Sequence, residues 1–343
     1  MPVEASISPW RMAVCCSPHP TAPGRHLAGA ENALNERLEE GKMKTRVVLS
    51  ILIAVLAAVA AATGLFWQTD GRSFEFQTLR GETVTIVGHG LYRYETASAA
   101  TQGQAQDAVT LVIGIPLLLG AMFLRARGSL RGKLLLAGTL AYFLYTYMSY
   151  AFGAAYNPLF LIYVALFTLS LAALVLAVMD IDIVSLPSHF PANLPRRSIA
   201  AVLFAVGGFL LLAWSGRILP SLAEDRPPFG LESYTTLVIQ VLDLGLIVPL
   251  AILAGVLLLG RTGWGYLLAS VALIKGFTMG TAVSTMAFAI LFAGEQVSLI
   301  ELIVFPTLTV SIIALTVVLL KSVRERDVTS PSRSLTLEDT ASR

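Results

Sequence analysis

Histidine and cysteine are scarce in this chain, and neither is placed for buried chemistry. Four histidines are present, all outside the long apolar runs: His19, His26, His89 and His189. No pair of them can ligate a haem inside a helix bundle. The two cysteines, Cys15 and Cys16, are adjacent and lack the spacing of a zinc or redox motif. We therefore expect no cofactor, no metal site and no catalytic residue of these kinds.

Charge is sparse as well. Only 13% of the residues are charged, the net charge is +2, and 55% are hydrophobic, whereas a soluble domain is about 25% charged. No phosphate-binding loop or helical His–Glu–His zinc motif occurs, and no basic cluster indicates a nucleic-acid partner. The composition predicts a polytopic membrane protein whose principal partner is the lipid bilayer, and an enzyme is not the expected class.

Apolar runs of roughly 20 residues, the length that crosses a bilayer as a helix, are what the chain does contain. We expect them at Val47–Trp67, Ala108–Leu124, Leu134–Phe152, Pro158–Met179, Ile199–Trp214, Tyr234–Leu259, Trp264–Phe292 and Val297–Leu320. The predicted fold is an all-α transmembrane bundle of about eight helices.

Lysine and arginine predict the orientation of these helices. The connection after the second run carries Arg125, Arg127, Arg131 and Lys133, whereas the next connection, residues 153–157, has no charge. Alternation then places the other basic connections and both termini on the side of that basic connection. Because positive loops face the cytoplasm, we expect a bacterial plasma-membrane protein with cytoplasmic N- and C-termini.

The expected organisation along the chain has seven parts. Residues 1–42 show no periodicity and are interpreted as a disordered or mis-annotated extension, since Met43 followed by basic residues resembles a bacterial start. Residues 43–67 form the first transmembrane helix or, alternatively, a cleaved signal peptide. The other parts are an external cap and tether (68–107), helices 2–4 (108–180), a cytoplasmic loop (181–198), helices 5–8 (199–320) and a disordered cytoplasmic tail (321–343).

The external segment 68–107 has the alternation of short strands. Phe74 and Phe76, then Val84 and Ile86, alternate with polar residues, and the pattern returns around Tyr92. This predicts a small β-meander of three strands on the outer helix ends, followed by a flexible tether over residues 96–106. An ordinary loop with some strand character is the alternative.

An internal repeat is suggested when the chain is slid along itself, without gaps, until Pro116 matches Pro249. Gly132 then matches Gly265, and nine of the thirty positions from 111 to 140 are identical. We call this shift the repeat offset. Both matched segments begin on the outer side, so the repeat offset predicts two parallel four-helix repeats related by an axis along the membrane normal.

One part of the second half resembles a known group of proteins. The stretch YTTLVIQVLDLG (residues 234–245), followed by GYLLA (265–269), resembles an uncharacterised family of bacterial polytopic integral membrane proteins. The resemblance runs from about Phe74 to the eighth apolar run. It implies a bacterial membrane location, carries no assigned activity and transfers no site residue.

Two charges inside the apolar runs, Asp243 and Lys275, are the candidate site. A buried charge in a membrane requires a partner, but Asp243 lies nearer the outer end of its helix than Lys275 does, so a direct ion pair would be strained. Thr236 and Gln240 share the predicted helical face of Asp243. Two tyrosines of the third run, Tyr142 and Tyr145, lie at intermediate depth and can bridge the charges. Tyr147 and Tyr150 are assigned to the outer aromatic belt.

Two functions fit these residues. In the first, the polar face lines an outward-facing cavity that binds or transports a small solute or ion, with Asp243 as the protonatable residue. In the second, the protein is a structural or accessory membrane subunit in which the charges only fix helix packing. The sequence does not identify the solute or the oligomeric state.

Overall fold

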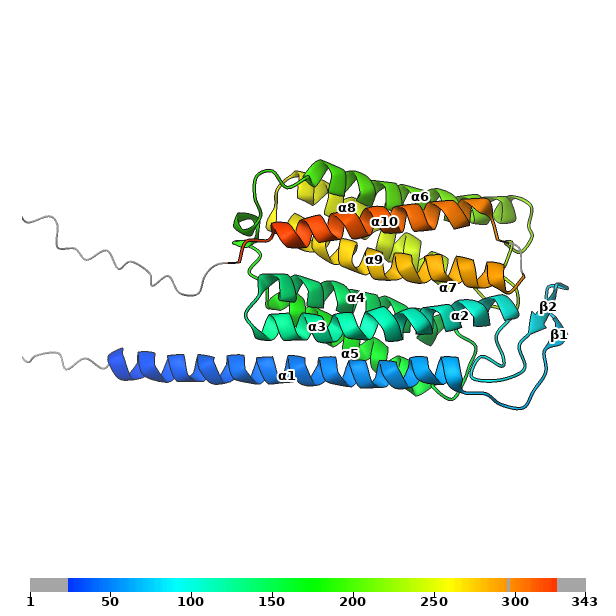
Figure 1. Ribbon diagram of the computed structural model, residues 1–343, viewed down its shortest axis with the longest axis horizontal. Helices are drawn as coiled ribbons and strands as arrows, with labels where there is room; N and C mark the ends of the chain where they lie inside the picture. Colours follow the sequence, from blue (N-terminus) through cyan, green and yellow to red (C-terminus); the bar gives the residue numbers. More distant parts are fainter. Residues whose placement is uncertain (1–23, 295–296, 326–343) are drawn as a thin grey trace, which may run out of the picture. The chain divides into compact units, whose positions relative to one another are not determined.

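The computed structural model describes residues 24–294 and 297–325. The chain forms two compact units, Met1–Thr45 and Arg46–Arg343, and the second contains the helix bundle. Ten α-helices are present in the described residues (Figure 1): α1 (Gly24–Phe66), α2 (Ala97–Val109), α3 (Ile115–Ala126), α4 (Leu130–Gly153), α5 (Phe160–Met179), α6 (Arg196–Ala223), α7 (Val238–Leu242), α8 (Val248–Leu259), α9 (Gly263–Phe292) and α10 (Leu299–Ser322). Short turns join α2 to α3 and α7 to α8, which leaves eight long helical rods and confirms the predicted all-α bundle.

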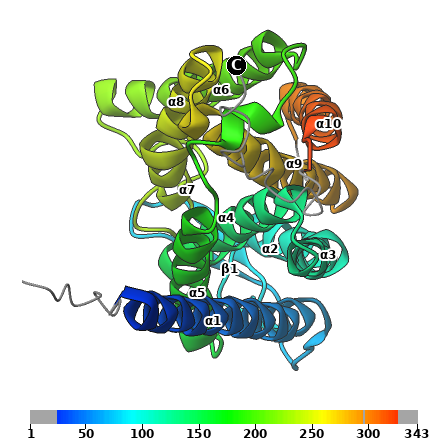
Figure 2. The ribbon, with the colours of Figure 1, turned by 90° about the vertical axis from the view of Figure 1, so that its left-hand side faces the viewer.

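Seven of these rods are long and apolar enough to cross a membrane, counted over the described residues. The eighth, α4, has 24 residues and at about 1.5 Å per residue is also long enough. It is less apolar because it occupies the middle of the bundle and packs against α3, α5 and α9 (Figure 2). Its polar side chains therefore face other helices rather than lipid.

Two π-helical turns interrupt the paired rods. Thr110–Gly114 (η1) joins α2 to α3, and Asp243–Ile247 (η3) joins α7 to α8. Each is followed closely by a proline, Pro116 or Pro249. Because proline lacks an N–H and its ring clashes with the carbonyl four residues earlier, the chain widens locally into bonds of five-residue spacing. The backbone irregularity close to each of these two prolines therefore takes the form of a π turn.

The same local features recur at the repeat offset. The π turns begin at Thr110 and Asp243. The following helices α4 and α9 begin after caps in which Ser129 and Thr262 accept the N–H of Gly132 and Gly265. Both glycines lie so close to the preceding helix that a Cβ would approach its backbone to 2.3 and 2.2 Å. The correspondences support the internal repeat, with α4 and α9 as the central, parallel pair.

The external segment differs in part from its prediction. Strands β1 (Phe74–Gln77) and β2 (Thr83–Ile86) form an antiparallel hairpin, but the expected third strand near Tyr92 is a turn, and only an isolated bridge from Ile86 to Thr96 follows. The Tyr92 side chain is buried in the bundle and does not lie on a sheet. The expected tether over residues 96–106 is helix α2, capped by Thr96, and it extends the second span.

The chain ends also differ from expectation where they are described. Residues 24–42, assigned to a disordered extension, are helical as part of α1, whereas residues 1–23 lie outside the described residues. At the other end α10 continues to Ser322, and residues 326–343 lie outside the described part. The helix predicted to begin at Tyr234 begins at Val238.

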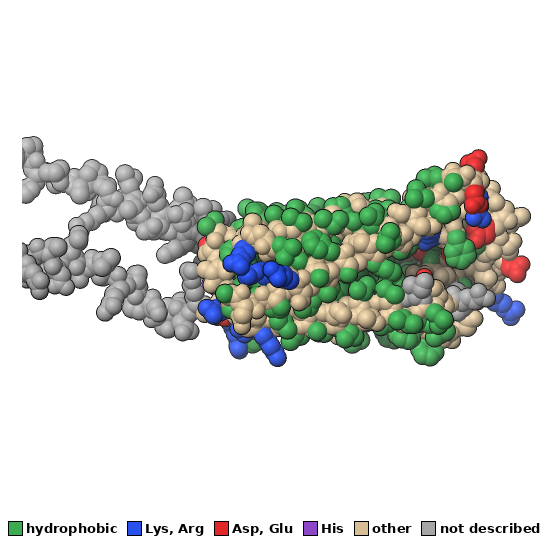
Figure 3. Space-filling model, turned by 90° about the horizontal axis from the view of Figure 1, so that it is seen from above, with side chains coloured by type: hydrophobic (Ala, Val, Ile, Leu, Met, Phe, Trp, Pro, Cys, Tyr) green, Lys and Arg blue, Asp and Glu red, His purple; other side chains and the backbone are tan. Residues whose placement is uncertain are grey.

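The two ends of the bundle carry different charges. On the face drawn in Figure 3, hydrophobic side chains extend along the bundle, most of the visible Lys and Arg lie at one end, and most of the visible Asp and Glu lie at the other. We call the first the basic end and the second, where β1 and β2 lie, the hairpin end. At the basic end Asp180 accepts from Arg46 at 2.7 Å and from Arg125 at 3.0 Å, and Lys133 Nζ lies 3.6 Å away. This carboxylate connects the middle of α1 to the basic ends of α3, α4 and α5.

Candidate functional site

Asp243 is buried at the start of the second π turn, and both of its carboxylate oxygens are hydrogen-bonded. Tyr145 of α4 donates its hydroxyl to Oδ1 at 2.6 Å, and Trp214 of α6 donates its indole N–H to Oδ2 at 2.9 Å. Both donors are neutral. Side chains from two other helices thus donate to this carboxylate. Both oxygens are hydrogen-bonded, and neither donor brings a positive charge.

Lys275 reaches the same place from α9, but through the tyrosine. Its Nζ lies 3.9 Å from the centroid of the Tyr145 ring, a cation–π geometry. Among the described residues no carboxylate lies within 4.0 Å of this ammonium. Tyr145 therefore lies between the two charges, with its hydroxyl on Asp243 and its ring face on Lys275.

Tyr142 belongs to a different group, contrary to the predicted chain from Lys275 to Asp243. Its hydroxyl accepts from Gln106 Nε2 at 2.7 Å and lies 2.8 Å from Thr110 Oγ1. Because Thr110 donates its own proton to the Gln106 carbonyl, Tyr142 donates to Thr110. The Tyr142 hydroxyl is thus hydrogen-bonded to Thr110, the first residue of the first π turn. At the repeat offset Thr110 is the residue equivalent to Asp243.

Gln240 and Thr236 line a hollow at the hairpin end. Gln240 is buried one turn before Asp243, whereas Thr236 is exposed and lies before the helix, so the predicted three-residue helical face is reduced to two residues. The hollow has a volume of about 350 Å³ and is lined by Ile218, Pro228, Leu231, Thr235, Thr236, Leu237, Gln240, Val241 and Leu244. Its lining includes residues on both sides of Asp243 in the sequence but not Asp243 itself.

Sequence reasoning missed three parts of the buried polar network. Trp214 was placed at a helix end, although it is a neighbour of Asp243. Tyr147 and Tyr150 are not in an outer aromatic belt, because both rings pack inside the bundle against Tyr163. Asp107, assigned to the external segment 68–107, is a buried residue of α2. The repeat carried a signal for it, because the repeat offset places Asp107 opposite Gln240.

The chemistry open to this arrangement is limited. Among the described residues no group of three or more His, Cys, Asp or Glu side chains could hold a metal ion. A buried carboxylate with neutral donors can bind a proton or a small cation, and its hydrogen bonds would rearrange when it did so.

Comparison with known proteins does not extend this description. No protein-family model, curated protein or solved structure matches the chain. What is established is a polytopic membrane protein with buried polar and charged residues.

Proposed function

We propose that this protein binds a small solute or ion from its hairpin end and transports it, with Asp243 as the protonatable residue. The observation that carries the proposal is the buried Asp243 carboxylate, held by Tyr145 and Trp214 and not by a cation. An aspartate inside a membrane-spanning segment is costly, up to about 2.5–3.5 kcal/mol at the helix centre on insertion scales. A group retained at that cost is a functional candidate by default.

The hollow supports access to this carboxylate. Its volume of about 350 Å³ lies in the range of roughly 300–1,000 Å³ typical of small-molecule sites. Its wall is mostly apolar, and Gln240 and the two threonines supply hydrogen bonds. Because Gln240 lies one turn outside Asp243, a solute in the hollow and a proton on Asp243 can influence each other.

The orientation of the protein is part of the proposal. Lys and Arg gather at the basic end (Figure 3), and such residues mark the cytoplasmic side of bacterial inner-membrane proteins. The hairpin end and its hollow then face outward. This is the orientation required of a protein that takes a solute or ion from outside the cell.

Trp214 provides a direct test, because its indole N–H bonds to Asp243. A parent with Trp10→Phe, Trp67→Phe and Trp264→Phe leaves Trp214 as the single tryptophan, whose emission is excited apart from that of the tyrosines. In lipid nanodiscs we expect its emission to change with pH as the carboxylate is protonated. Asp243→Asn should abolish that change, and Asp70→Asn, an exposed residue of the loop before β1, should preserve it. Emission that is independent of pH in the parent, or unaltered by Asp243→Asn, would contradict the proposal.

Transport requires a second measurement, with the proton itself as the probe. Proteoliposomes that contain a pH-sensitive dye are given a potassium diffusion potential, and the rate of internal acidification is recorded. We expect the parent to acidify faster than Asp243→Asn. Equal rates, together with a pH-dependent Trp214 signal, would leave proton binding in place and exclude proton movement.

The structural alternative rests on Lys275. Its cation–π contact with Tyr145 joins α9 to α4 in a fixed register, and that contact is compatible with a bundle in which the charges serve only packing. Combining Asp243→Asn with Lys275→Met separates the transport function from this alternative.

A further inference from the structure

A second buried carboxylate, Asp107, lies in the first half of the repeat and takes no part in the function proposed above. Tyr92 donates its hydroxyl to Asp107 Oδ2 at 2.5 Å, and Tyr150 of α4 lies 3.3 Å from Oδ1. Among the described residues no basic group lies within 4.0 Å of it. Like Asp243, it is held by neutral donors alone.

Two glycines leave the space that Asp107 and its partner Tyr92 occupy. A Cβ on Gly64 of α1 would lie 1.8 Å from Asp107 Oδ2, and a Cβ on Gly103 would lie 2.9 Å from the Tyr92 ring. Any side chain at either position would displace the pair. Helices α1 and α2 thus pack tightly around Asp107. An apolar residue at this position would avoid the cost of removing a carboxylate from water.

A small cleft leads from the hairpin end toward this pair. It has a volume of about 10 Å³ and is bordered by the exposed Trp67, Gln68 and Gln104 and by the buried Gly64 and Tyr92. A polar space of about that size holds one water molecule. Water in the cleft can therefore contact Tyr92, the hydrogen-bond partner of Asp107, whereas an organic solute does not fit there.

The groups that face Asp107 from the packed elements are neutral. They are Tyr142, Tyr147 and Tyr150 of α4, Tyr163 of α5 and Tyr92, and they give the carboxylate no compensating positive charge. On α9, which packs against α2, the ammonium of Lys275 is directed to Tyr145. His89 at the cleft bonds through Nδ1 to the Val87 carbonyl.

The repeat relates this centre to the first one. At the repeat offset, Asp107 and Thr110 correspond to Gln240 and Asp243. Each half therefore places a polar pair at the first residue of a π turn and three residues before it. One member of each pair is a carboxylate. In the first half it lies three residues before the π turn (Asp107), and in the second half it is the first residue of the turn (Asp243). Tyrosines of α4 contact both.

We propose that Asp107 is a second proton-binding site, reached by water from the hairpin end and separate from Asp243. A hydronium ion in the cleft transfers one proton to a carboxylate oxygen of Asp107 and leaves as water, and the reverse step releases the proton. The site takes a proton and no larger ligand. It would stand even if the hollow near Gln240 bound nothing.

Infrared difference spectroscopy of the full-length protein in nanodiscs tests the proposal. As the pH is lowered, protonation of Asp107 should add a carboxyl C=O band that Asp107→Asn removes and Asp243→Asn retains. If the spectra of the parent and of Asp107→Asn superimpose throughout the titration, Asp107 does not change protonation and the proposal is wrong. Loss of the Asp243 signal alone would affect only the function proposed earlier.

Access through the cleft is tested by exchange into D₂O. We expect the Asp107 band to shift on transfer to D₂O, and Gln104→Trp, at an exposed border position, to slow that shift. Tyr92→Phe removes the shorter hydrogen bond to the charged form and should move the midpoint of the band to higher pH. Gly120→Ala, where a Cβ meets nothing within 4 Å, is the control and should match the parent. A band that does not shift in D₂O, or a Gln104→Trp variant that exchanges as fast as the parent, would overturn the proposed route.

Discussion

Lys275 and Asp243 are joined through the ring and hydroxyl of Tyr145 and make no direct ion pair. The hydroxyl donates to Asp243 at 2.6 Å, and the ring centroid lies 3.9 Å from Lys275 Nζ. The aromatic side chain separates the charges without isolating them. Neither carboxylate oxygen of Asp243 therefore bonds to the Lys275 ammonium, because Tyr145 and Trp214 donate to them instead.

A double variant separates function from packing at this pair. If the charges serve only architecture, Asp243→Asn and Lys275→Met should each lower the free energy of unfolding by about 3–5 kcal/mol, and the double variant should recover most of the loss. We expect Asp243→Asn instead to remain folded, because asparagine still accepts from Tyr145, and the double variant to gain nothing over Lys275→Met. Unfolding curves in detergent decide. Full recovery in the double variant would favour the structural alternative.

The orientation is tested at two exposed loop positions. In a background with Cys15→Ser and Cys16→Ser, Leu79→Cys lies in the β1–β2 turn and Val184→Cys in the basic-end loop, and both parent residues are almost fully exposed (104% and 91%). If the hairpin end is outside, a membrane-impermeant thiol reagent added to intact cells should label Leu79→Cys alone. Labelling of Val184→Cys alone would reverse the topology and close the proposed outward access.

Close packing of α9 against α10 predicts the effect of enlarging a glycine. A Cβ on Gly280 would lie 2.5 Å from Thr309 Oγ1, and Ser284 lies 3.3 Å from the same hydroxyl. Overpacking costs roughly 1–3 kcal/mol, so Gly280→Leu should lower both folded yield and thermal stability. Gly120→Leu is the matched control, because that position has open space. Equal behaviour of the two variants would show that α9 and α10 separate at this level.

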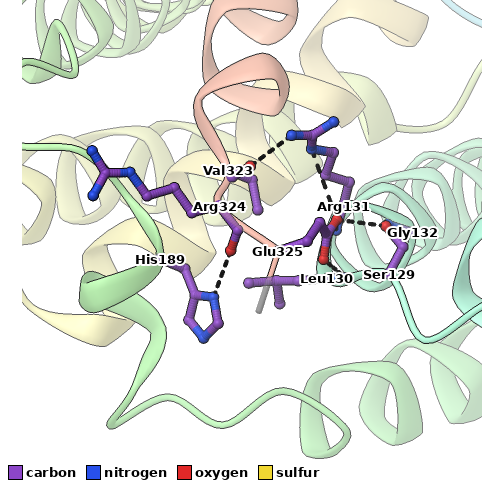
Figure 4. Close-up of polar contacts among 8 residues, drawn as sticks. All are labelled: Ser129, Leu130, Arg131, Gly132, His189, Val323, Arg324 and Glu325. Atoms are coloured by element: carbon purple, nitrogen blue, oxygen red, sulfur yellow. Dashed lines mark hydrogen bonds and ion pairs between the residues drawn. The ribbon is translucent and has the colours of Figure 1, made fainter. Parts of the chain in front are cut away.

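Glu325 predicts an acid-sensitive contact at the basic end. Its carboxylate accepts from Ser129 Oγ at 2.7 Å and from the Leu130 N–H at 2.8 Å, at the start of α4 (Figure 4). Partial burial raises the pKa of Glu325, but these bonds and the nearby Arg131 outweigh it and hold the pKa below its ordinary value. A depressed pKa stabilises the fold above the unfolded-state pKa, about 4.3, and that stability is lost as the pH falls through the folded-state value.

Glu325→Gln should therefore lower stability at neutral pH by roughly 0.3–1 kcal/mol, the usual effect of a carboxylate at a helix N-terminus. The difference from the parent should vanish in acid. Glu75→Gln, on the exposed strand β1, should show no such difference at neutral pH. Thermal unfolding across pH measures both variants, and a Glu325→Gln effect that persists in acid would assign the contact to packing instead of charge.

The sequence by itself determined the membrane architecture, because the constraint that acts on it is one-dimensional. A helix must hold about 20 apolar residues to span the bilayer, so the runs located the helices, and Pro116 and Pro249 marked the points where the backbone pattern changes. Positions that match at the repeat offset also share backbone features in the structure, such as the caps at Ser129 and Thr262. Depth along a helix can be counted, and the separation of Asp243 from Lys275 followed from it.

Only the tertiary structure decided which side chains meet. Spacing along one helix does not say which neighbouring helix a given face contacts. Tyr142 therefore bonds to Gln106 and does not contact Lys275 as predicted, and Trp214 bonds to Asp243 from a third helix. Thr236 does not lie on the predicted helical face because the helix begins after it. Asp107 was hidden for the same reason: its polar segment is predicted to lie outside the bundle, whereas the fold buries it against Tyr92, Tyr150 and Gly64. Contacts between helices depend on their rotation and pairing, which packing of the whole bundle sets.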